Sequence, residues 1–598
     1  MKSIFSIIIV SLITLNLFSQ TASRLANSPF PVSQIPDTLY VVDMEYYTPD
    51  QKLTTITLQG MLAKTKPMIF CWDLSGYGKW IDDFNNNYNV HIDSTYWHDF
   101  NGLITHFKNN IGGYYICDLD TNSTNVAITA CGLHSDKIAV TTNIEPLMTN
   151  LGIPLEYDVR NLDEQWMLTN ATNLSTKIIS YQNHSKSTFL GDYTVFSGAF
   201  QFFDDINAQL TTDAFLRMDD NAILFGWGID ERETVEKASE NTINVVPADW
   251  ARNISVMSNF EATTIQHVHS DSIINTDNVH TVCFLMSDGD NINWYLHEFA
   301  DTNRQEWYGS SERGHVDIGW TISASFSELA PTIMKYVYDR ASNTSNAQDY
   351  FVASTSGLGY MYPNLYPNLN SSTNLLNEYM NKADLNILNI IGTQYNDNDM
   401  LPFLQQPNID AIFYYGYDSY ADNGDIRWIN NKPVIEGRYN FWDGFNTVQQ
   451  LANKLNNEST DAHSQDGYSL IPVHAWSRTV ADINAVAELL DSNVIIVTPE
   501  EFVQRIQAKL GTTTSSKKLI NKVNINIYPN PAKEKLYVDY YNSNLAYLLI
   551  YNNLGELILD KTIYNHKNTI DISNFNNGLY IIKIIGDNEI YTKSIIIR

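Results

Sequence analysis

The sequence predicts an α/β protein in which a (β/α)8-like or distorted seven-stranded barrel follows an open α/β domain and precedes a small C-terminal β-sandwich. Three observations predict this fold class. Residues 275–510 alternate apolar β-like runs with helical patterns. Residues 35–150 show a shorter pattern of the same kind. The last 78 residues contain only short β-rich runs separated by turn residues.

The barrel is predicted from the number of β-like runs in residues 275–510. Roughly 235 residues for eight β/α units is the size of a (β/α)8 barrel or of a seven-stranded relative. The runs are 281–286, 316–322, 350–353, 387–391, 411–415, 433–436, 470–474 and 494–497. Helices are expected over 328–340, 373–382, 400–405, 445–456, 480–490 and 500–510.

The N-terminal half is predicted to be α/β as well. Residues 21–150 are expected to form an open α/β domain with strands such as Leu39–Asp43 and Met68–Trp72. Residues 151–274 are interpreted as a connecting α/β region that contains the segment Leu224–Glu231. No Gly-rich phosphate-binding pattern opens a helix in residues 35–150, so a nucleotide site is not predicted there.

The C-terminal tail is predicted to be a separate domain. Residues 511–520 have linker composition, and residues 521–598 contain short β runs broken by Asn-Pro, Leu-Gly and Asn-Asn-Gly turns, which favours a β-sandwich. Four segments, Tyr528–Pro531, Ile550–Asn552, Asp571–Ser573 and Gly578–Tyr580, follow in a characteristic order. In this order the tail resembles the C-terminal sorting domain of type IX secretion cargo. The resemblance implies that the secretion machinery is a partner and that the tail is removed after export; an ordinary sugar-binding sandwich is the alternative.

The N-terminus has the pattern of a cleaved signal peptide over residues 1–20. Lys2 precedes an apolar run from Ile4 to Phe18 that is too short to span a bilayer comfortably. No later segment has eighteen uninterrupted apolar residues, so no transmembrane segment is expected after signal removal. We therefore expect a secreted protein, extracellular or at the cell surface, that leaves the cell through the signal peptide and the type IX system.

The charge balance is strongly acidic. The chain has 37 Lys and Arg against 67 Asp and Glu, a formal net charge of −30. This balance argues against nucleic acid as a partner, because a polyanion would be repelled. An acidic face suits neutral or cationic ligands, although the charge also serves solubility.

The four cysteines, Cys71, Cys117, Cys131 and Cys283, lie far apart without a CxxC pair. A structural zinc site is therefore not expected. Export permits a disulfide, for which Cys117 and Cys131 are the expected pair, and buried free thiols are the alternative.

Catalytic residues are expected at the carboxyl ends of the predicted barrel strands, because these ends converge on the mouth of a barrel. The first strand ends in Ser287-Asp288-Gly289-Asp290-Asn291. Asp288 and Asp290 are candidate acid, nucleophile or metal-binding carboxylates, and Asn291 is a candidate substrate-binding residue. The alternative is an Asp-Gly turn that caps the next helix.

Three later strand ends add candidates. Glu436 closes the sixth strand, where it is either catalytic or part of a structural ion pair with Arg438. His474 closes the seventh strand and is a candidate proton shuttle or metal ligand, or else a satisfied core histidine. Asp418 follows the fifth strand, with a loop turn as the alternative. Trp294, Trp442 and Trp476 are predicted to bind sugar rings, and Arg438 is also a candidate binding residue.

The third strand runs into Gly357-Leu358-Gly359-Tyr360-Met361-Tyr362-Pro363. The two glycines permit unusual backbone angles, and Tyr360 and Tyr362 offer aromatic faces of the kind that sugars bind. This heptad resembles the motif of the GxGYxYP family, which is named as a glycoside hydrolase family. Ser287–Asn291, Ala248–Ala251 with Asn253, and Leu58–Leu62 before Lys66-Pro67 also resemble it. The resemblance covers roughly residues 35–510 and implies carbohydrate hydrolysis.

Two segments of the chain resemble parts of metal sites. His267-Val268-His269 precedes the first barrel strand, with no HExxH or HxxxH after it, and is interpreted as structural. The closing Thr498–Phe502 is similar to polysaccharide deacetylases, but their adjacent aspartates and paired histidines are missing. No metal and no cofactor are therefore predicted.

The predicted function is that of a secreted glycoside hydrolase acting on a poly- or oligosaccharide. One carboxylic acid protonates the leaving oxygen, and one carboxylate attacks or activates water. The predicted pair is Asp290 or Asp288 with Glu436, supported by His474 and Asp418. Two alternatives remain open, a metal-assisted polysaccharide deacetylase or esterase that uses Asp288, Asp290 and His474, and a non-catalytic glycan-binding protein.

Overall fold

The structure is a computed structural model that describes residues 21–73, 75–262, 264–269, 277–344, 347–511, 525–540, 546–552, 556–563, 566–585 and 590–598. The chain divides into two compact units, Met1–Gly511 and Thr512–Arg598. The predicted signal peptide and, apart from Gly511, the predicted linker lie outside the described residues.

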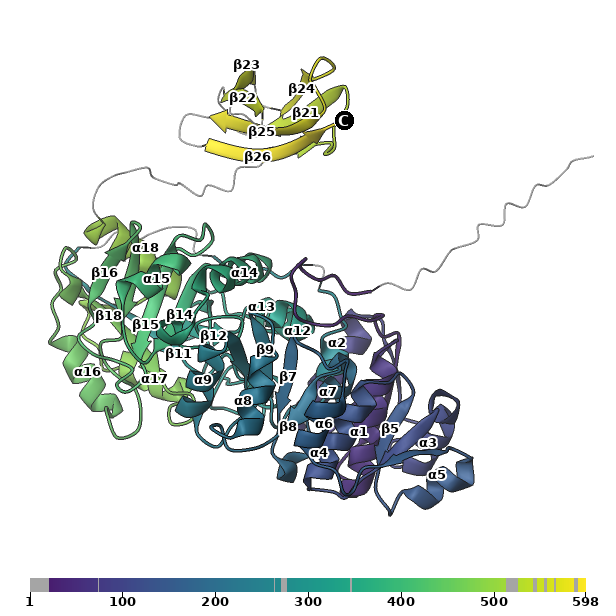
Figure 1. Cartoon of the computed structure of the whole chain (residues 1–598). Coiled ribbons are helices and arrows are strands. Elements are labelled where there is room, and N and C mark those ends of the chain that lie inside the picture. The colour runs from purple at the N-terminus through teal and green to yellow at the C-terminus, as the bar shows by residue number, and fades with distance from the viewer. Residues whose placement is uncertain are drawn as a thin grey trace, which may run out of the picture. The chain divides into compact units, whose positions relative to one another are not determined.

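Residues 277–511 contain a curled sheet, which we call the curled sheet throughout (Figure 1). Its order is β16-β17-β15-β14-β13-β12-β11-β18, and β19 also pairs with β11. All eight predicted strand runs are present, and they pair in parallel. The strands are β11 (His280–Met286), β12 (Ile318–Ile322), β13 (Asp349–Ala353), β14 (Ile387–Gly392), β15 (Ala411–Gly416), β16 (Ile426–Ile429), β17 (Lys432–Glu436), β18 (Tyr468–Val473) and β19 (Val494–Ile496).

Strand β16 was not predicted, and it is antiparallel to β17 at the end of the sheet. Isolated bridges join Gly437 to Leu470 and Phe441 to Val473, so the chain that follows β17 also contacts β18. The curled sheet is thus shaped like a half-barrel, and its strands are buried on both faces as in other parallel sheets.

Helices accompany the strands of the curled sheet, and their ends carry local capping signals. Thr447 and Thr479 form capping boxes with Gln450 and Asp482. Pro331 divides the predicted helix 328–340 into two, because proline suits a first turn and not a helix interior. The helices are α11 (Ile292–His297), α12 (Phe326–Leu329), α13 (Pro331–Asp339), α14 (Leu369–Lys382), α15 (Asp397–Leu404), α16 (Val448–Asn456), α17 (Val480–Ala487) and α18 (Pro499–Leu510).

Residues 38–246 form three smaller parallel sheets, which we call the first, second and third N-terminal sheets. The first has the order β2-β1-β3, the second β5-β4-β6 and the third β10-β9-β7-β8. The strands predicted in residues 35–150 therefore belong to two sheets. The strands are β1 (Thr38–Asp43), β2 (Ile69–Trp72), β3 (His91–Asp93), β4 (Gly113–Ile116), β5 (Lys137–Val140), β6 (Leu155–Asp158), β7 (Ile178–Tyr181), β8 (Phe200–Phe202), β9 (Ala222–Gly226) and β10 (Ile243–Val246).

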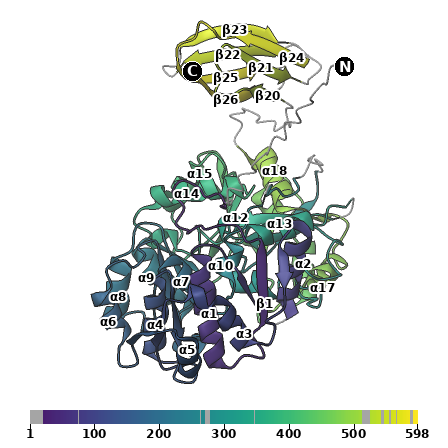
Figure 2. The same ribbon diagram turned by 90° about the vertical axis from the view of Figure 1, so that its right-hand side faces the viewer.

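The helices of this part are α1 (Pro49–Ala63), α2 (Gly78–Asn87), α3 (Phe100–Phe107), α4 (Asn122–Gly132), α5 (Glu145–Leu151), α6 (Glu164–Asn170), α7 (Gly191–Ser197), α8 (Gln209–Leu216), α9 (Glu231–Glu240) and α10 (Ile254–Met257). Helices α1, α4 and α7 lie side by side (Figures 1 and 2). Gly60 on α1 allows the close approach, since a Cβ atom there would lie 2.3 Å from the carbonyl oxygen of Asp192 on α7.

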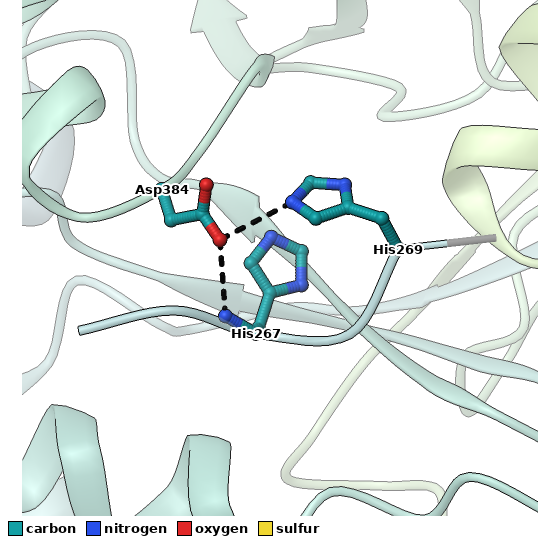
Figure 3. Close-up of side chains that lie close together, drawn as sticks. All are labelled: His267, His269 and Asp384. Carbon is teal, nitrogen blue, oxygen red and sulfur yellow. Dashed lines mark hydrogen bonds and ion pairs between the residues drawn. The ribbon is translucent and has the colours of Figure 1, made fainter. Parts of the chain in front are cut away.

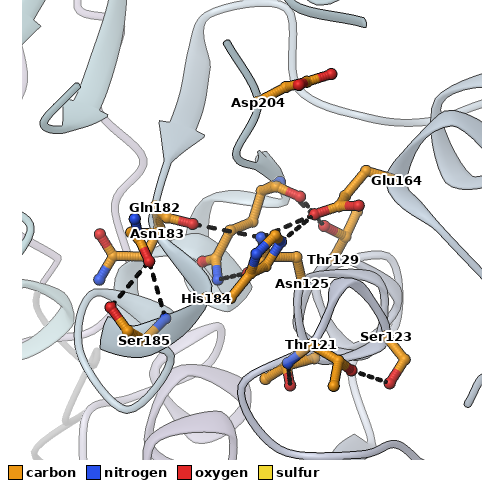
Figure 4. A network of polar contacts seen from close by, with 12 residues as sticks. Thr121, Ser123, Asn125, Thr129, Glu164, Gln182, Asn183, His184, Ser185 and Asp204 are labelled. Atoms are coloured by element: carbon orange, nitrogen blue, oxygen red, sulfur yellow. Dashed lines mark hydrogen bonds and ion pairs between the residues drawn. The ribbon is translucent and has the colours of Figure 1, made fainter. Parts of the chain in front are cut away.

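A buried polar network joins the second and third N-terminal sheets (Figure 4). Glu164 on α6 accepts a hydrogen bond from Asn125 on α4 (3.1 Å) and contacts the Nε2 atom of His184 (2.7 Å). Gln182, which follows β7, donates to the backbone carbonyl of Asp249 (3.0 Å). The network therefore extends to the segment after β10, which lines the cavity described below.

The C-terminal unit consists of two antiparallel sheets, β20-β21-β24 and β23-β22-β25-β26. Leu536 and Val538 from one sheet and Ile550 and Ile582 from the other belong to a single hydrophobic cluster. The strands are β20 (Ile525–Tyr528), β21 (Lys535–Tyr540), β22 (Ala546–Asn552), β23 (Leu557–Ile563), β24 (His566–Asp571), β25 (Gly578–Ile585) and β26 (Ile590–Ile597).

Two sequence-based expectations concern the whole chain. The predicted Cys117–Cys131 disulfide is wrong, because all four cysteines are buried free thiols. Burial raises the pKa values of Cys117 and Cys131, which keeps both thiols protonated. Among the described residues, no helix combines the length and the apolar character that crossing a membrane requires.

A candidate active site with three interacting carboxylates

A cavity of about 840 Å³ lies between the curled sheet and the third N-terminal sheet. From the curled sheet it receives residues at or after the carboxyl ends of β11, β13, β14, β15 and β18, the end at which parallel α/β folds bind ligands. The N-terminal part of the chain also lines the cavity, through Asp73, Lys186, Phe189, Trp227, Glu231, Pro247, Asp249 and Trp250. Three acidic residues of the cavity lining, Asp288, Asp290 and Glu231, interact electrostatically with one another.

The loop after β11 brings Asp288 and Asp290 into the cavity wall. Asp288 has a left-handed backbone conformation (φ 70°), and Gly289 lies so close to β12 that a Cβ atom there would be 2.0 Å from the backbone of Thr321. Asn291 caps α11 by accepting a hydrogen bond from the backbone N–H of Trp294 (3.3 Å). The capping role considered for this loop thus belongs to Asn291, although Asn291 also lines the cavity.

Asp290 is buried, with 8% of its surface exposed. Burial is the largest cause of its altered acidity, and the negative charges of Asp288 and Glu231 add to it. Together they raise the pKa of Asp290 to about 7. Asp290 is therefore a carboxyl group that can still carry a proton near neutral pH, as a general acid must.

Asp288 is held by two donors. The indole Nε1 of Trp476 donates to its Oδ1 atom (2.8 Å), and the hydroxyl of Ser287 donates to its Oδ2 atom. Both carboxylate oxygens therefore have partners within the protein. Asp288 is in this way a fixed charge beside Asp290.

Glu231 is a functional candidate that sequence reasoning missed. It is the first residue of α9 and comes after the carboxyl end of β9 (Ala222–Gly226), as Asp288 comes after the carboxyl end of β11, although at a greater distance along the chain. Burial is the largest cause that raises the pKa of Glu231, and the charge of Asp288 raises it further. The hydroxyl of Tyr360 donates to its Oε1 atom (3.1 Å). A carboxylate after the apolar strand Ala222–Gly226 was the signal that could have identified it.

The heptad Gly357–Pro363 docks against β10. The backbones of Tyr360 and Val245 exchange two hydrogen bonds (2.7 and 3.0 Å). A Cβ atom at Gly359 would lie 2.6 Å from the carbonyl oxygen of Val245, so this contact requires glycine. Tyr360 lines the cavity, whereas Tyr362 is fully buried and lies outside the cavity lining. The motif therefore joins the two sheets and places Tyr360 on Glu231.

Aromatic residues surround the carboxylates. The ring of His474 stacks on Trp442 with a centroid distance of 3.9 Å, and its Nδ1 atom contacts the hydroxyl of Ser477 (2.8 Å). Burial lowers the pKa of His474. Trp294 is 3% exposed and belongs to the wall, whereas Trp476 is half-exposed.

Four predicted site residues lie outside the cavity lining: Glu436, Arg438, Asp418 and Tyr362. Glu436 forms an ion pair with Arg427 of β16. The expected partner Arg438 instead faces Glu458 (3.8 Å) and Asp466 (3.5 Å), so that part of the prediction is wrong. The reason is the unpredicted strand β16, whose antiparallel pairing with β17 places Arg427 beside Glu436.

Asp418 is exposed and pairs with Arg232 (2.9 Å). A metal shared by Asp288, Asp290 and His474 would need their ligand atoms to converge. Across the part of the chain that the structure describes, a group of three such residues with all ligand atoms within 4.8 Å occurs at His267, His269 and Asp384 instead.

Comparisons with known proteins agree with this architecture. Four family models match in succession, described as "GxGYxYP_N 1st domain" (residues 38–109), "GxGYxYP_N second domain" (111–173), "GxGYxYP third domain" (175–259) and "GxGYxYP putative glycoside hydrolase C-terminal domain" (278–507). A fifth, described as "Secretion system C-terminal sorting domain", matches residues 526–598.

Among solved structures, "a putative hydrolase from Bacteroides thetaiotaomicron VPI-5482" has a TM-score of 0.75 and 29% identity, over 82% of this chain and 99% of that one. An engineered protein matches with a TM-score of only 0.19 and 9% identity, over 48% of this chain and 78% of that one. None of the curated proteins matches the chain. The sorting domain indicates export to the cell surface or beyond, and the four successive matches over residues 38–507 show that the chain belongs to the GxGYxYP family.

Proposed function

We propose that the protein is an exported glycoside hydrolase that cleaves a poly- or oligosaccharide in the cavity between the curled sheet and the third N-terminal sheet. The observation that carries the proposal is Asp290, a buried carboxyl group with a pKa of about 7 beside two further carboxylates. The glycoside hydrolase description of the matched family and the hydrolase description of the similar structure support the reaction class.

Asp290 acts as the proton donor in this proposal. Glycosidic cleavage needs one protonated carboxyl group at the leaving oxygen, together with a carboxylate that attacks the sugar or activates water. A general acid works best when its pKa lies near the working pH. The pKa of about 7 therefore suits Asp290 to donate a proton near neutral pH.

Glu231 supplies the second carboxylate. Its Oε1 atom accepts the Tyr360 hydrogen bond, and its side chain reaches the cavity from the wall facing Asp290. Asp288 is less suited to proton transfer, because Trp476 and Ser287 donate to its two oxygens. Its role is electrostatic, since its charge raises the pKa of both Asp290 and Glu231.

The cavity wall selects the sugar. Trp250, Trp442 and Trp476 offer indole faces to pyranose rings. The wall contains six acidic side chains against one lysine, Lys186, and that lysine is paired with Asp249. Sugars that carry carboxylate or sulfate groups would be repelled, so neutral or amino sugars are the expected substrates.

The finer fold assignments belong to the same proposal. The bridges from Gly437 and Phe441 to β18 support a distorted seven-stranded (β/α) barrel for residues 275–510. The shared core of the two C-terminal sheets supports a small β-sandwich for residues 521–598. The ion pairs of Glu436 and Asp418 support structural roles for these two residues.

Hydrolysis of a panel of neutral, amino and acidic oligosaccharides tests the proposal, with product length measured by chromatography. On an accepted glycan, we expect Asp290→Asn and Glu231→Gln each to lower kcat by about 10²–10⁴-fold. The matched control is Asp443→Asn, because Asp443 is an exposed aspartate outside the cavity lining. Wild-type turnover in both variants would overturn the assignment.

Two other outcomes would select the alternative functions. Tight glycan binding without any change in glycan length would indicate a glycan-binding protein. Release of acetate that a chelator abolishes would indicate a metal-assisted esterase.

A further inference from the structure

A second group of chemically active side chains lies away from the cavity. His267 and His269 belong to the segment 264–269, between α10 and β11. Asp384 lies in the turn between α14 and β14, at the amino end of that strand. The cavity, in contrast, lies at the carboxyl ends of the strands of the curled sheet. The cluster therefore belongs to the end of the sheet where side chains serve stability in barrel folds.

The three side chains converge on one position (Figure 3). One ligand atom from each residue lies within 4.8 Å of the others. The Nε2 atom of His269 is 3.2 Å from the Oδ2 atom of Asp384. Figure 3 shows the ring of His267 turning one nitrogen toward the Asp384 carboxylate and the ring of His269.

His267 is the observation that points to a missing ligand. Its side chain is buried, since only 6% of the residue's surface is exposed. Among the described residues, neither ring nitrogen has a hydrogen-bond partner. The ring packs instead against Tyr350 (4.6 Å between centroids) and Tyr338 (5.2 Å). An unpartnered buried polar atom destabilises the folded state. A ligand at one of the two ring nitrogens would therefore remove an unfavourable feature.

The surroundings of His269 match the second shell of a metal site. Its Nδ1 atom faces the Oε1 atom of Glu500 (3.0 Å), while its Nε2 atom faces Asp384. Histidines that bind metals almost always donate their other ring N–H to such an acceptor, which fixes the tautomer and the ring orientation.

We propose that His267, His269 and Asp384 bind one zinc ion, with Glu500 as the carboxylate that orients His269. Imidazole and carboxylate ligands suit Zn²⁺, whose tetrahedral sites place ligand atoms about 3.3 Å apart. The three ligand atoms lie within 4.8 Å of one another, so zinc binding would draw them together to reach that spacing. The ion would fasten the segment 264–269 to the turn before β14, so its role is structural and does not depend on the proposed glycosidase activity.

Metal binding to the full-length protein tests the proposal. Protein treated with EDTA and desalted is titrated with ZnCl₂ in a calorimeter, and its melting temperature is compared with and without Zn²⁺. We expect one equivalent to bind and the melting temperature to rise. Co²⁺ in place of Zn²⁺ should give the visible absorption of a tetrahedral site. Failure of the wild-type protein to bind one equivalent would overturn the proposal.

Two variants locate the ion. Asp384 has a left-handed backbone conformation (φ 58°), which asparagine tolerates, so Asp384→Asn removes a ligand and keeps the turn. His267→Gln removes a second ligand. Each should lower zinc affinity at least 100-fold and abolish the rise in melting temperature, whereas the exposed His315→Gln should change neither. Binding of equal strength in both variants would place the ion elsewhere and refute the site. Glycan hydrolysis unchanged by EDTA would separate this site from the proposed active site.

Discussion

Replacing Asp290 with asparagine should stabilise the protein at neutral pH and lose that effect in acid. A carboxyl group with a raised pKa keeps its proton in the folded state, while the unfolded chain releases it above about pH 4. Asp290 therefore lowers the free energy of unfolding, and the size of this effect grows as the pH rises from about 4 to about 7. The rise in pKa from about 3.9 to about 7 corresponds to about 4 kcal/mol above pH 7. An asparagine side chain at this position has no charge to bury, so the variant should gain up to this amount.

Thermal unfolding of wild type and variant between pH 4 and pH 8 measures the effect. For a unit as large as Met1–Gly511, a change of 1 kcal/mol in the free energy of unfolding corresponds to about 1 °C in melting temperature. We expect the difference between variant and wild type to grow by about 4 °C from pH 4 to pH 8. Asp443→Asn is the control, because Asp443 is exposed and lies outside the cavity lining. A difference for Asp290→Asn that is equally large at pH 4 and pH 8, or that shrinks as the pH rises, would refute the reasoning.

Three further predictions concern the neighbours of Asp290 and Glu231. Asp288→Asn removes a charge that raises the pKa of Asp290, so the alkaline fall of kcat/KM should move to lower pH in a pH–rate profile. Tyr360→Phe removes a hydrogen bond that lowers the pKa of Glu231, so the acidic limb of the same profile should move to higher pH; an unchanged limb would exclude Glu231 as the base. Gly359→Ala places a methyl group 2.6 Å from a carbonyl oxygen and should destabilise the protein by about 1–3 kcal/mol, which a lower melting temperature would show. Gly444→Ala is the comparison: a Cβ atom there has open space but φ is 85°, so this variant measures the cost of backbone strain alone.

The parallel strands of the curled sheet could be predicted because burial on both faces makes each of them a nearly continuous apolar run. β11 and β14 show this directly, since every residue in both strands is buried. β16 was missed because it is short and only Ile429 in it is buried. A signal for it was present in Asn430 and Asn431, which both have positive φ values in the two-residue connection to β17. Asparagine is favoured in such hairpin turns.

The candidate site could be predicted only where one sheet supplies it. The rule that chemistry lies at the carboxyl ends of strands placed Asp288, Asp290 and His474 in the cavity lining. The same rule selected Glu436, which instead forms an ion pair with Arg427. Glu231 obeys the rule equally well, but its strand belongs to another sheet, and a single sequence does not reveal which sheets face each other. The His267–His269 pair was interpreted as structural because it precedes the first barrel strand and no HExxH or HxxxH follows it. Its neighbour Asp384 lies 115 residues from His269 and so gave no signal at short range.

The position of Glu231 suggests a structural role for the GxGYxYP motif, which contacts both the third N-terminal sheet and Glu231. If Asp290 and Glu231 act as a pair, their separation depends on how the curled sheet packs against the third N-terminal sheet. The motif contacts both sheets. Gly359 lets the backbone reach β10, the bonds between Tyr360 and Val245 fix the register, and the Tyr360 hydroxyl then holds the carboxylate itself. A sugar-binding platform would need exposed tyrosine faces, whereas Tyr360 is 4% exposed and Tyr362 is fully buried. The contacts of the motif therefore explain it first as a connection between the two sheets at the candidate site, where Tyr360 also lines the cavity.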